Sequence, residues 1–295
     1  YGTEWATSST FPKSDYVLKE GRPVGLVRGL TADGFYTTDD FTYENGVYTL
    51  KEGVADVSSA VFPNYHLHNG MNERPAGQLA YPGMAKFKDL NDDGIINDDD
   101  VDVIGDMTPV HTGGFNINAT YKNFDLGLYY NWSYGNEIYN VNKLAALYGY
   151  KEGAVYENKL SIVKDCYKIY DVVNGELVAL TTPEQLNAAN ANAKLPLAYS
   201  ENGYVSTLGI EDGSYLRLNT LTLGYTLPKS MLQKAGISNL RVYGSIYNVF
   251  TITGYSGIDA EVSTSTSTKT YPQLGMDWGT YPRARSFVLG VNLSF

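Results

Sequence analysis

The sequence predicts an all-β fold whose C-terminal part consists of long amphipathic strands of the kind that form transmembrane barrels. Three observations support this prediction: strict alternation of apolar and polar residues, connections that alternate between short and long, and a composition rich in Tyr and Gly. The 295 residues include 26 Tyr, 10 Phe and 30 Gly, and 18% are charged. Tyr combines an apolar ring with a polar tip, so it suits surfaces that are half apolar and half hydrated, such as a lipid–water interface.

The strongest alternation begins at about residue 112. In 124–134, aromatic or aliphatic residues at every second position alternate with polar or small ones, which predicts a strand with two different faces. Its length of about 11 residues matches the roughly 9–11 that cross a bilayer at a tilt. A phase slip near Asn219-Thr220 predicts a β-bulge. The expected strands are 115–121, 124–134, 214–227, one from Leu240 onward and one at 286–295.

The connections between these strands alternate in length. Two are short turns, and two are long, mostly polar stretches at about 135–212 and 251–281. Long loops on one side and short turns on the other are typical of outer-membrane barrels. In the first long connection we expect short helices at 144–148 and at 183–193, the second with Thr182 as its N-cap. A membrane barrel needs at least about eight strands, so the strands expected here cannot close one by themselves. We therefore expect further strands from an N-terminal portion.

Composition and charge exclude several function classes. The formal net charge is −10, whereas a protein that binds nucleic acid needs clustered Lys and Arg. No stretch approaches the roughly 18 apolar residues of a membrane-spanning helix. Cys166 is the only cysteine, so no internal disulfide is possible, and we expect an inert packed thiol. Because the chain opens at Tyr1 without an initiator Met, we expect a processed protein or a piece of a larger one.

Residues 1–111 read as an irregular region of turns that contains a distinct acidic loop. The loop, DLNDDGIINDDD, occupies 89–100. Its spacing matches an EF-hand loop, in which oxygens at positions 1, 3, 5, 7, 9 and 12 surround calcium and Gly at position 6 allows a sharp turn. The predicted ligands are Asp89, Asn91, Asp93, the carbonyl of Ile95, Asn97 and Asp100.

This metal prediction has a departure and an alternative. Asp100 stands where Glu usually supplies two oxygens, so a weaker site is expected, and no convincing helices flank the loop. The alternative is a solvated acidic turn in which Asn and Asp serve as turn formers. We expect a bound divalent cation, calcium with magnesium as the alternative, that clamps the loop structurally.

Other candidates for chemistry are weaker. His66 and His68 could bind a metal from one strand face, but no third ligand is visible, and ordinary loop histidines are the simpler interpretation. The few His residues, one Cys and many Ser do not define a catalytic triad, and the Gly-rich stretches do not form a phosphate-binding motif. The sequence therefore predicts a protein that is not an enzyme.

Taken in order, these motifs resemble the C-terminal third of the SusC/RagA family of TonB-dependent outer-membrane transporters. The acidic loop followed by a Gly-rich strand, and the segment SYLRLNTLTLGYTLP, are the most specific similarities. The similar stretches are 20–36, 86–106, 112–140, 212–228, 240–261 and 281–295.

The resemblance implies the setting in which the chain acts. Residues 112–295 would be the last strands of a barrel of about 22 strands in the bacterial outer membrane, and 1–111 an extracellular loop region. The implied partners are an N-terminal barrel and plug portion, TonB acting through that portion, and a SusD-like lipoprotein that closes as a lid. The implied substrate is an oligosaccharide or an oligopeptide. Four loop or strand-end aromatic residues are candidates for stacking on sugars, with girdle or loop packing as the alternative: Trp132, Tyr134, Tyr139 and Trp278.

A second function fits part of the sequence. A secreted, calcium-stabilised β-module that binds carbohydrate would also be rich in Tyr and would carry the acidic loop. It requires a self-contained fold, which the bilayer-length strands and the one-sided loops contradict. The transporter segment is therefore the favoured interpretation.

Overall fold

The computed structural model describes residues 4–7, 15–59, 61, 74–148, 160–198, 205–233, 236–262, 274–277 and 279–295. The chain divides into two compact units, each made of two segments. The first comprises Tyr1–Gly105 and Asn140–Ile210, and the second comprises Asp106–Tyr139 and Glu211–Phe295. Most of the connection expected at 135–212 therefore belongs to the same unit as the N-terminal residues. Within the described ranges, no helix combines the length and apolar character needed to cross a membrane.

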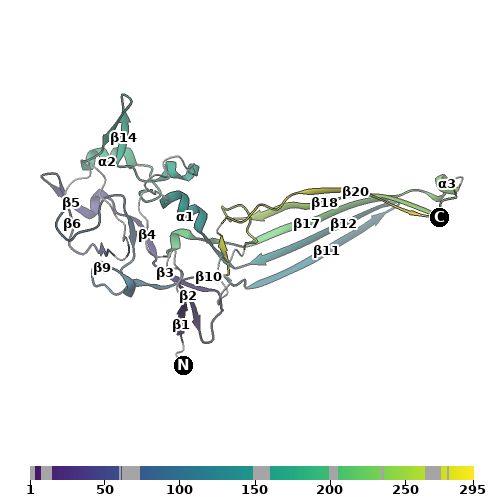
Figure 1. Ribbon diagram of the computed structural model, residues 1–295, viewed down its shortest axis with the longest axis horizontal. Helices are drawn as coiled ribbons and strands as arrows, with labels where there is room; N and C mark the ends of the chain where they lie inside the picture. The colour runs from purple at the N-terminus through teal and green to yellow at the C-terminus, as the bar shows by residue number, and fades with distance from the viewer. Residues whose placement is uncertain are drawn as a thin grey trace. The chain divides into compact units, whose positions relative to one another are not determined.

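The second unit is built on a five-stranded sheet with the order β11-β12-β17-β18-β20 (Figure 1). Each strand pairs antiparallel with the next one in this order. The strands are β11 (His111–Tyr121), β12 (Phe124–Tyr134), β17 (Tyr215–Thr226), β18 (Asn239–Thr253) and β20 (Ser286–Ser294). All five expected strands are thus confirmed. The first begins earlier than predicted because Gly113 and Gly114 conceal its alternation while still pairing with β12.

The two faces of this sheet differ sharply in chemistry. Cross-strand partners share a face, so each row of partners samples one side. One row across the five strands consists of Ile117, Leu128, Leu221, Ile246 and Phe287, and the next consists of Asn118, Gly127, Thr222, Ser245 and Val288. Large apolar side chains of the first face are exposed, with Phe287 at 71% and Leu289 at 88%. One face is therefore suited to lipid and the other to water.

The predicted bulge lies in β17. Leu218 and Thr220 pair with consecutive residues of β12, so Asn219 between them has no partner there. Because of this extra residue, the leucines before and after it lie on the same apolar face. Arg217 consequently falls on the polar face, opposite Asn131.

The connections alternate in length as predicted. A tight turn with Lys122 in the left-handed region (φ 55°) joins β11 to β12, and a segment with α3 (Lys229–Leu232) joins β17 to β18. Parts of the two long connections pair in a small sheet of β16 (Ile210–Asp212), β13 (Glu137–Asn140) and β19 (Met276–Asp277). The long connections are thus interlocked by backbone pairing.

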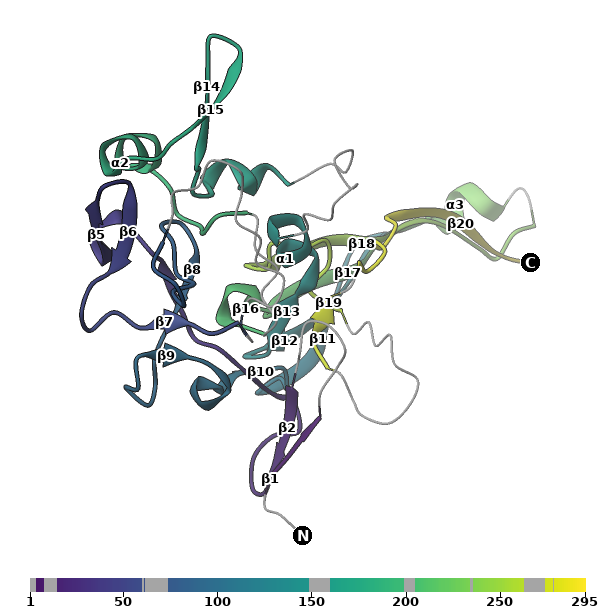
Figure 2. The same ribbon diagram turned by 60° about the vertical axis from the view of Figure 1, so that its left-hand side comes forward.

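Among its described residues, the first unit contains several small sheets and two α-helices (Figure 2). The largest sheet has the order β1-β2-β3-β10. The elements are β1 (Glu4–Thr7), β2 (Asp15–Lys19), β3 (Leu26–Gly29), β10 (Asp102–Asp106), the pair β4 (Ala32–Phe35) and β8 (Ala85–Phe87), the hairpins β5 (Phe41–Glu44)–β6 (Val47–Leu50) and β14 (Tyr170–Val173)–β15 (Glu176–Ala179), the parallel pair β7 (Asp56–Val57) and β9 (Ile95–Ile96), and the helices α1 (Val141–Tyr148) and α2 (Pro183–Asn190).

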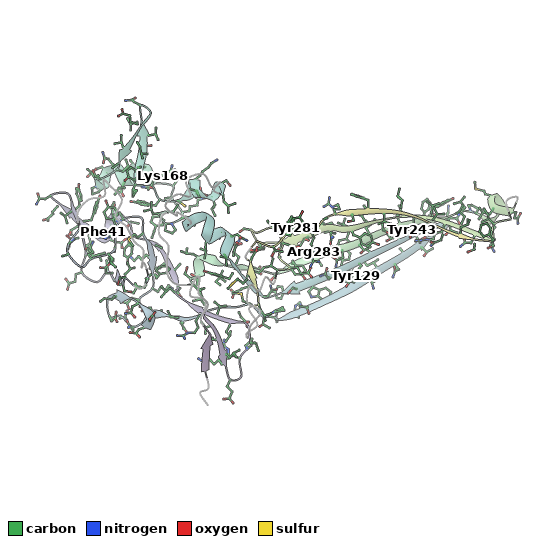
Figure 3. All side chains as sticks on the ribbon, in the orientation of Figure 1. Phe41, Tyr129, Lys168, Tyr243, Tyr281 and Arg283 are labelled. Carbon is green, nitrogen blue, oxygen red and sulfur yellow. The ribbon has the colours of Figure 1, made fainter. Side chains whose placement is uncertain are left out.

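An aromatic core holds this unit together. Phe41, labelled in Figure 3, packs edge-on against Tyr48, and the Tyr48 hydroxyl donates to the carbonyl of Thr181 at 3.0 Å. Leu186 of α2 is fully buried in the same core. The helix begins as predicted, with Pro183 in its first turn and a capping box led by Thr182. The stretch 160–198 is therefore packed structure rather than a simple surface loop.

Cys166 is buried, as expected of a packed thiol. Burial, with a smaller contribution from Asp165, raises the pKa of Cys166 from 9.0 to about 11. The thiolate is the reactive form, so we expect the folded protein at pH 8 to react with iodoacetamide far more slowly than the urea-unfolded protein. Mass spectrometry of the alkylated peptide measures the two rates, and equal rates would contradict the burial.

Candidate functional site

The acidic loop closes on itself through its side chains. Asp89 accepts a hydrogen bond from the backbone N–H of Gly94 at 2.7 Å, and Asp93 accepts one from that of Ile95 at 2.9 Å. Gly94 has a φ of 83°, the left-handed geometry that the EF-hand comparison requires of Gly at this position. The backbone pairing of β9 with β7 then fixes the loop to the core of the first unit.

Asp100 fastens the two ends of the loop together. It is fully buried, and its two carboxylate oxygens accept from the backbone N–H groups of Leu90 at 2.7 Å and Asn97 at 2.8 Å. The predicted metal-ligand atoms of the loop are all oxygens, which suits a hard cation. Among the described residues, however, no three His, Cys, Asp or Glu side chains form a metal-binding group. The calcium ligands Asp89, Asn91, Asp93, Ile95, Asn97 and Asp100 therefore stay a prediction, while His66 and His68 lie outside the described residues.

A calcium titration tests this prediction. At a calcium concentration about 100 times the Kd, binding to the folded state should stabilise it by about 2.7 kcal/mol and raise Tm. Asp89→Asn should abolish the rise because it removes a predicted charged ligand. Asp92→Asn is the matched control: it removes the same charge from a position outside the ligand set, where the left-handed backbone (φ 58°) tolerates Asn. An unchanged wild-type Tm would favour the solvated acidic turn.

The four aromatic candidates for substrate stacking lie in different environments. Trp132 and Tyr134 point to the apolar face of β12, where the Trp132 indole donates to His111 Nδ1 at 2.9 Å and Tyr134 stacks on the same histidine. Tyr139 is fully buried, and Trp278 lies outside the described residues. An aromatic group at the end of an apolar strand face is typical of an interface girdle. Substrate stacking by these residues stays a prediction.

A pocket of about 620 Å³ lies where the long connections meet the polar side of the sheet. Asn131, Ser133 and Tyr215 contribute from the strands, and Glu261 and Arg283 from the connection between β18 and β20. The remaining lining residues are Met107, Pro109, Thr112, Gly113, Trp132, Asn136, Ala260, Val262, Leu274 and Gly275. Such a volume lies within the usual range of about 300–1,000 Å³ for small-molecule sites.

A charge network underlies this pocket. Arg217, only 3% exposed, forms an ion pair with Asp259 and lies 3.2 Å from Glu261 Oε2. Arg283 approaches the other oxygens of the same two carboxylates, at 3.5 Å from Asp259 and 3.1 Å from Glu261. Figure 3 shows Arg283 beside the end of the sheet that carries the long connections. Two positive and two negative groups therefore face one another.

Further contacts hold the connection between β18 and β20 in place. The Tyr255 hydroxyl donates to Asp277 at 2.6 Å, and the backbone N–H groups of Gly279 and Thr280 donate to the other oxygen of Asp277. Burial by itself would raise the pKa of Asp277, but these hydrogen bonds outweigh it and lower the pKa below its usual value of 3.8. A lowered folded-state pKa means that Asp277 stabilises the fold at neutral pH and that this contribution is lost as the pH falls through the lowered pKa.

The charge network was missed in the sequence because its members are far apart along the chain. One signal was available: Arg217 is a charged residue within an otherwise alternating apolar strand, next to the phase slip. A buried arginine needs carboxylate partners. Nothing in the sequence around Asp259 and Glu261 indicates that these residues are the carboxylate partners of Arg217. Nothing around Arg283 indicates that it balances the second negative charge.

Comparison with known proteins identifies relatives of this chain. No protein-family model matches the chain. It is 30% identical over 284 residues, 95% of its length, to TonB-dependent receptor P3 of Formosa agariphila, of which it covers 23%. It is 34% identical over 136 residues, 44% of its length, to TonB-dependent receptor SusC of Bacteroides thetaiotaomicron, of which it covers 12%. The chain therefore spans about a quarter or less of these curated relatives.

Solved structures show the same fold. The RagAB peptide transporter aligns over 100% of this chain and 24% of its own, with a TM-score of 0.61 and 18% identity. The RagAB peptide importer in its open-open state aligns over 99% of this chain and 28% of its own, with a TM-score of 0.51 and 17% identity.

Proposed function

The chain belongs to the SusC/RagA-like TonB-dependent receptors as a C-terminal portion of their barrel, and we propose that it forms part of an outer-membrane importer of oligosaccharides or oligopeptides. The observation that carries this proposal is the five-stranded sheet with one apolar and one polar face. The apolar face would contact lipid, and the polar face would line the transport path.

The proposal includes the rest of the receptor. Among the described strands, β11 and β20 form the two edges of the large sheet. Open edges are not stable in a bilayer, so further strands from the N-terminal portion would pair with both. The same portion would supply the plug and the contact with TonB. We also propose a SusD-like lipoprotein as the partner on the outer surface, where the long connections would lie.

Purification from native outer membranes tests the assembly. After extraction in mild detergent, a tag on this chain should recover the plug-bearing barrel portion and a surface lipoprotein, identified by mass spectrometry. Recovery as a lone monomer in the salt-washed soluble fraction would contradict the proposal and favour the secreted carbohydrate-binding module.

Whole-cell uptake tests the activity. Cells that carry the complete receptor should accumulate a labelled oligosaccharide or oligopeptide, and deletion of TonB should abolish the accumulation. Accumulation of the same probes at equal rates without the receptor would show that it is not the importer.

A further inference from the structure

The pocket beside the polar face has a chemistry that narrows the choice of ligand. Among the described residues, the charged ones that line it are Glu261 and Arg283, which lie 3.1 Å apart. Their side chains are partly exposed, at 35% and 43%. A ligand in the pocket can therefore reach a carboxylate and a guanidinium that stand side by side.

These charges are already balanced within the protein. Arg217 and Arg283 face Asp259 and Glu261, so the network carries no net charge. A ligand carboxylate or ammonium would compete with an existing partner and would itself lose hydration, which is costly near buried ion pairs. A hydroxyl group has no such conflict, because it can donate to the carboxylate and accept from the guanidinium.

The remaining lining fits the same chemistry. Asn131, Ser133 and Tyr215 supply further amide and hydroxyl groups. Met107 and Val262 supply apolar surface, which suits the C–H faces of a sugar ring. A mixed lining of this kind, whose described residues carry no excess charge, matches a neutral and hydroxyl-rich ligand.

Arg217 is placed to keep this arrangement fixed. It is buried beside the pocket, pairs with Asp259, lies 3.2 Å from Glu261 and has its guanidinium 5.5 Å from the centre of the Tyr215 ring. It thus contacts two lining residues without lining the pocket itself. We propose that the pocket binds a neutral, hydroxyl-rich part of the imported substrate and that Arg217 is the positioning residue for Glu261 and Arg283. This inference rests on the proposed transport function and selects oligosaccharide over peptide.

Competition binding to the complete receptor, purified with its lipoprotein, tests the inference. The probes are a neutral gluco-oligosaccharide, an oligogalacturonate of equal length and a neutral peptide. The wild type should prefer the neutral oligosaccharide. Glu261→Gln leaves one excess positive charge and should shift the acidic-to-neutral affinity ratio about tenfold toward the oligogalacturonate, whereas Arg283→Gln should shift it the other way. Arg241→Gln, which removes an ion-paired arginine from another part of the polar face, should leave the ratio unchanged.

Arg217 is tested through the same ratio. Arg217→Lys retains the charge and should keep the wild-type preference, whereas Arg217→Gln should lose it. If Arg217→Gln fails to assemble, the Glu261 and Arg283 variants still test whether the pocket binds a neutral ligand. Both side chains are partly exposed, so these variants should assemble. Ratios within about twofold of the wild type in both variants, or a wild-type preference for the acidic probe or the peptide, would overturn the inference. Uptake of the labelled probes by intact cells distinguishes failure of the pocket assignment from failure of the proposed transport function. If the receptor imports a probe normally but the variants leave the acidic-to-neutral affinity ratio unchanged, only the pocket assignment is refuted. If the receptor imports none of the probes, the transport function is refuted.

Discussion

Deletion of Asn219 is expected to prevent the receptor from assembling in the outer membrane. Asn219 is the extra residue of the β17 bulge. Without it, the part of β17 on one side of the bulge must rotate by one position, because side chains alternate between faces with a period of two. Leu216 and Leu218 would then face the polar side, and Arg217 would face the lipid.

The expected cost of this deletion is large. An arginine on the lipid face costs up to about 2–4 kcal/mol near the bilayer midplane and less toward the interface. The deletion also separates Arg217 from Asp259, which leaves a carboxylate without its main partner. The abundance of the receptor in outer membranes, and the shift in gel mobility between unheated and boiled samples, report assembly.

Asn219→Ala is the matched control. It keeps the extra residue and removes only the side-chain hydrogen bond to Asn131, which measures 2.7 Å. The loss should be about 1 kcal/mol, so this variant should assemble. If the deletion variant assembled as well as Asn219→Ala, the bulge would not set the register of β17.

The large sheet was predictable from the sequence because its determinants are local. Alternation within a single strand identifies its two faces, and a one-residue phase slip locates the bulge at Asn219 without knowledge of the partner strands. The beginning of β11 was harder to predict because glycines, which lack a side chain, do not contribute to the alternation of apolar and polar residues. Gly113 nevertheless has a role in packing, since a Cβ there would lie 2.4 Å from the Trp132 ring.

The first unit and the pocket could not be predicted in the same way. The core of the first unit joins Tyr48 to Thr181, and the Thr38 hydroxyl bonds to Asn187, across sequence separations that no periodicity records. The stretch 160–198 is rich in apolar residues, but they follow no sustained strand or helix period that would mark the ones, such as Leu186, that enter the core. The pocket likewise depends on Arg217 meeting residues about 40 positions away. Local patterns therefore predict the strands of the large sheet, whereas the core of the first unit and the pocket become visible only in the folded structure.

Asp259→Ala is expected to have the second large effect, because it leaves the buried Arg217 without its main partner. Removing one member of a buried ion pair typically costs about 3–5 kcal/mol, since the remaining charge is desolvated and uncompensated. The loss should appear as a lower Tm of the purified receptor and as faster proteolysis of the segment from Tyr255 to Val262. Asp125→Ala is the matched control, because Asp125 pairs with Arg241 on the same face but both side chains are partly exposed, at 34% and 24%. Its loss should cost about 1 kcal/mol or less.

The two variants separate burial from pairing as the source of the effect. Equal losses from Asp259→Ala and Asp125→Ala would contradict the view that desolvation of Arg217 dominates. The double variant Arg217→Met, Asp259→Leu sharpens the test, because it removes both charges and fills the space with apolar groups. Replacing a buried pair in this way is often neutral or stabilising, so the double variant should be more stable than Asp259→Ala. It should nevertheless lose the preference for neutral ligands, since Glu261 and Arg283 would no longer be held in place. Stability and selectivity should therefore respond differently to the same two positions.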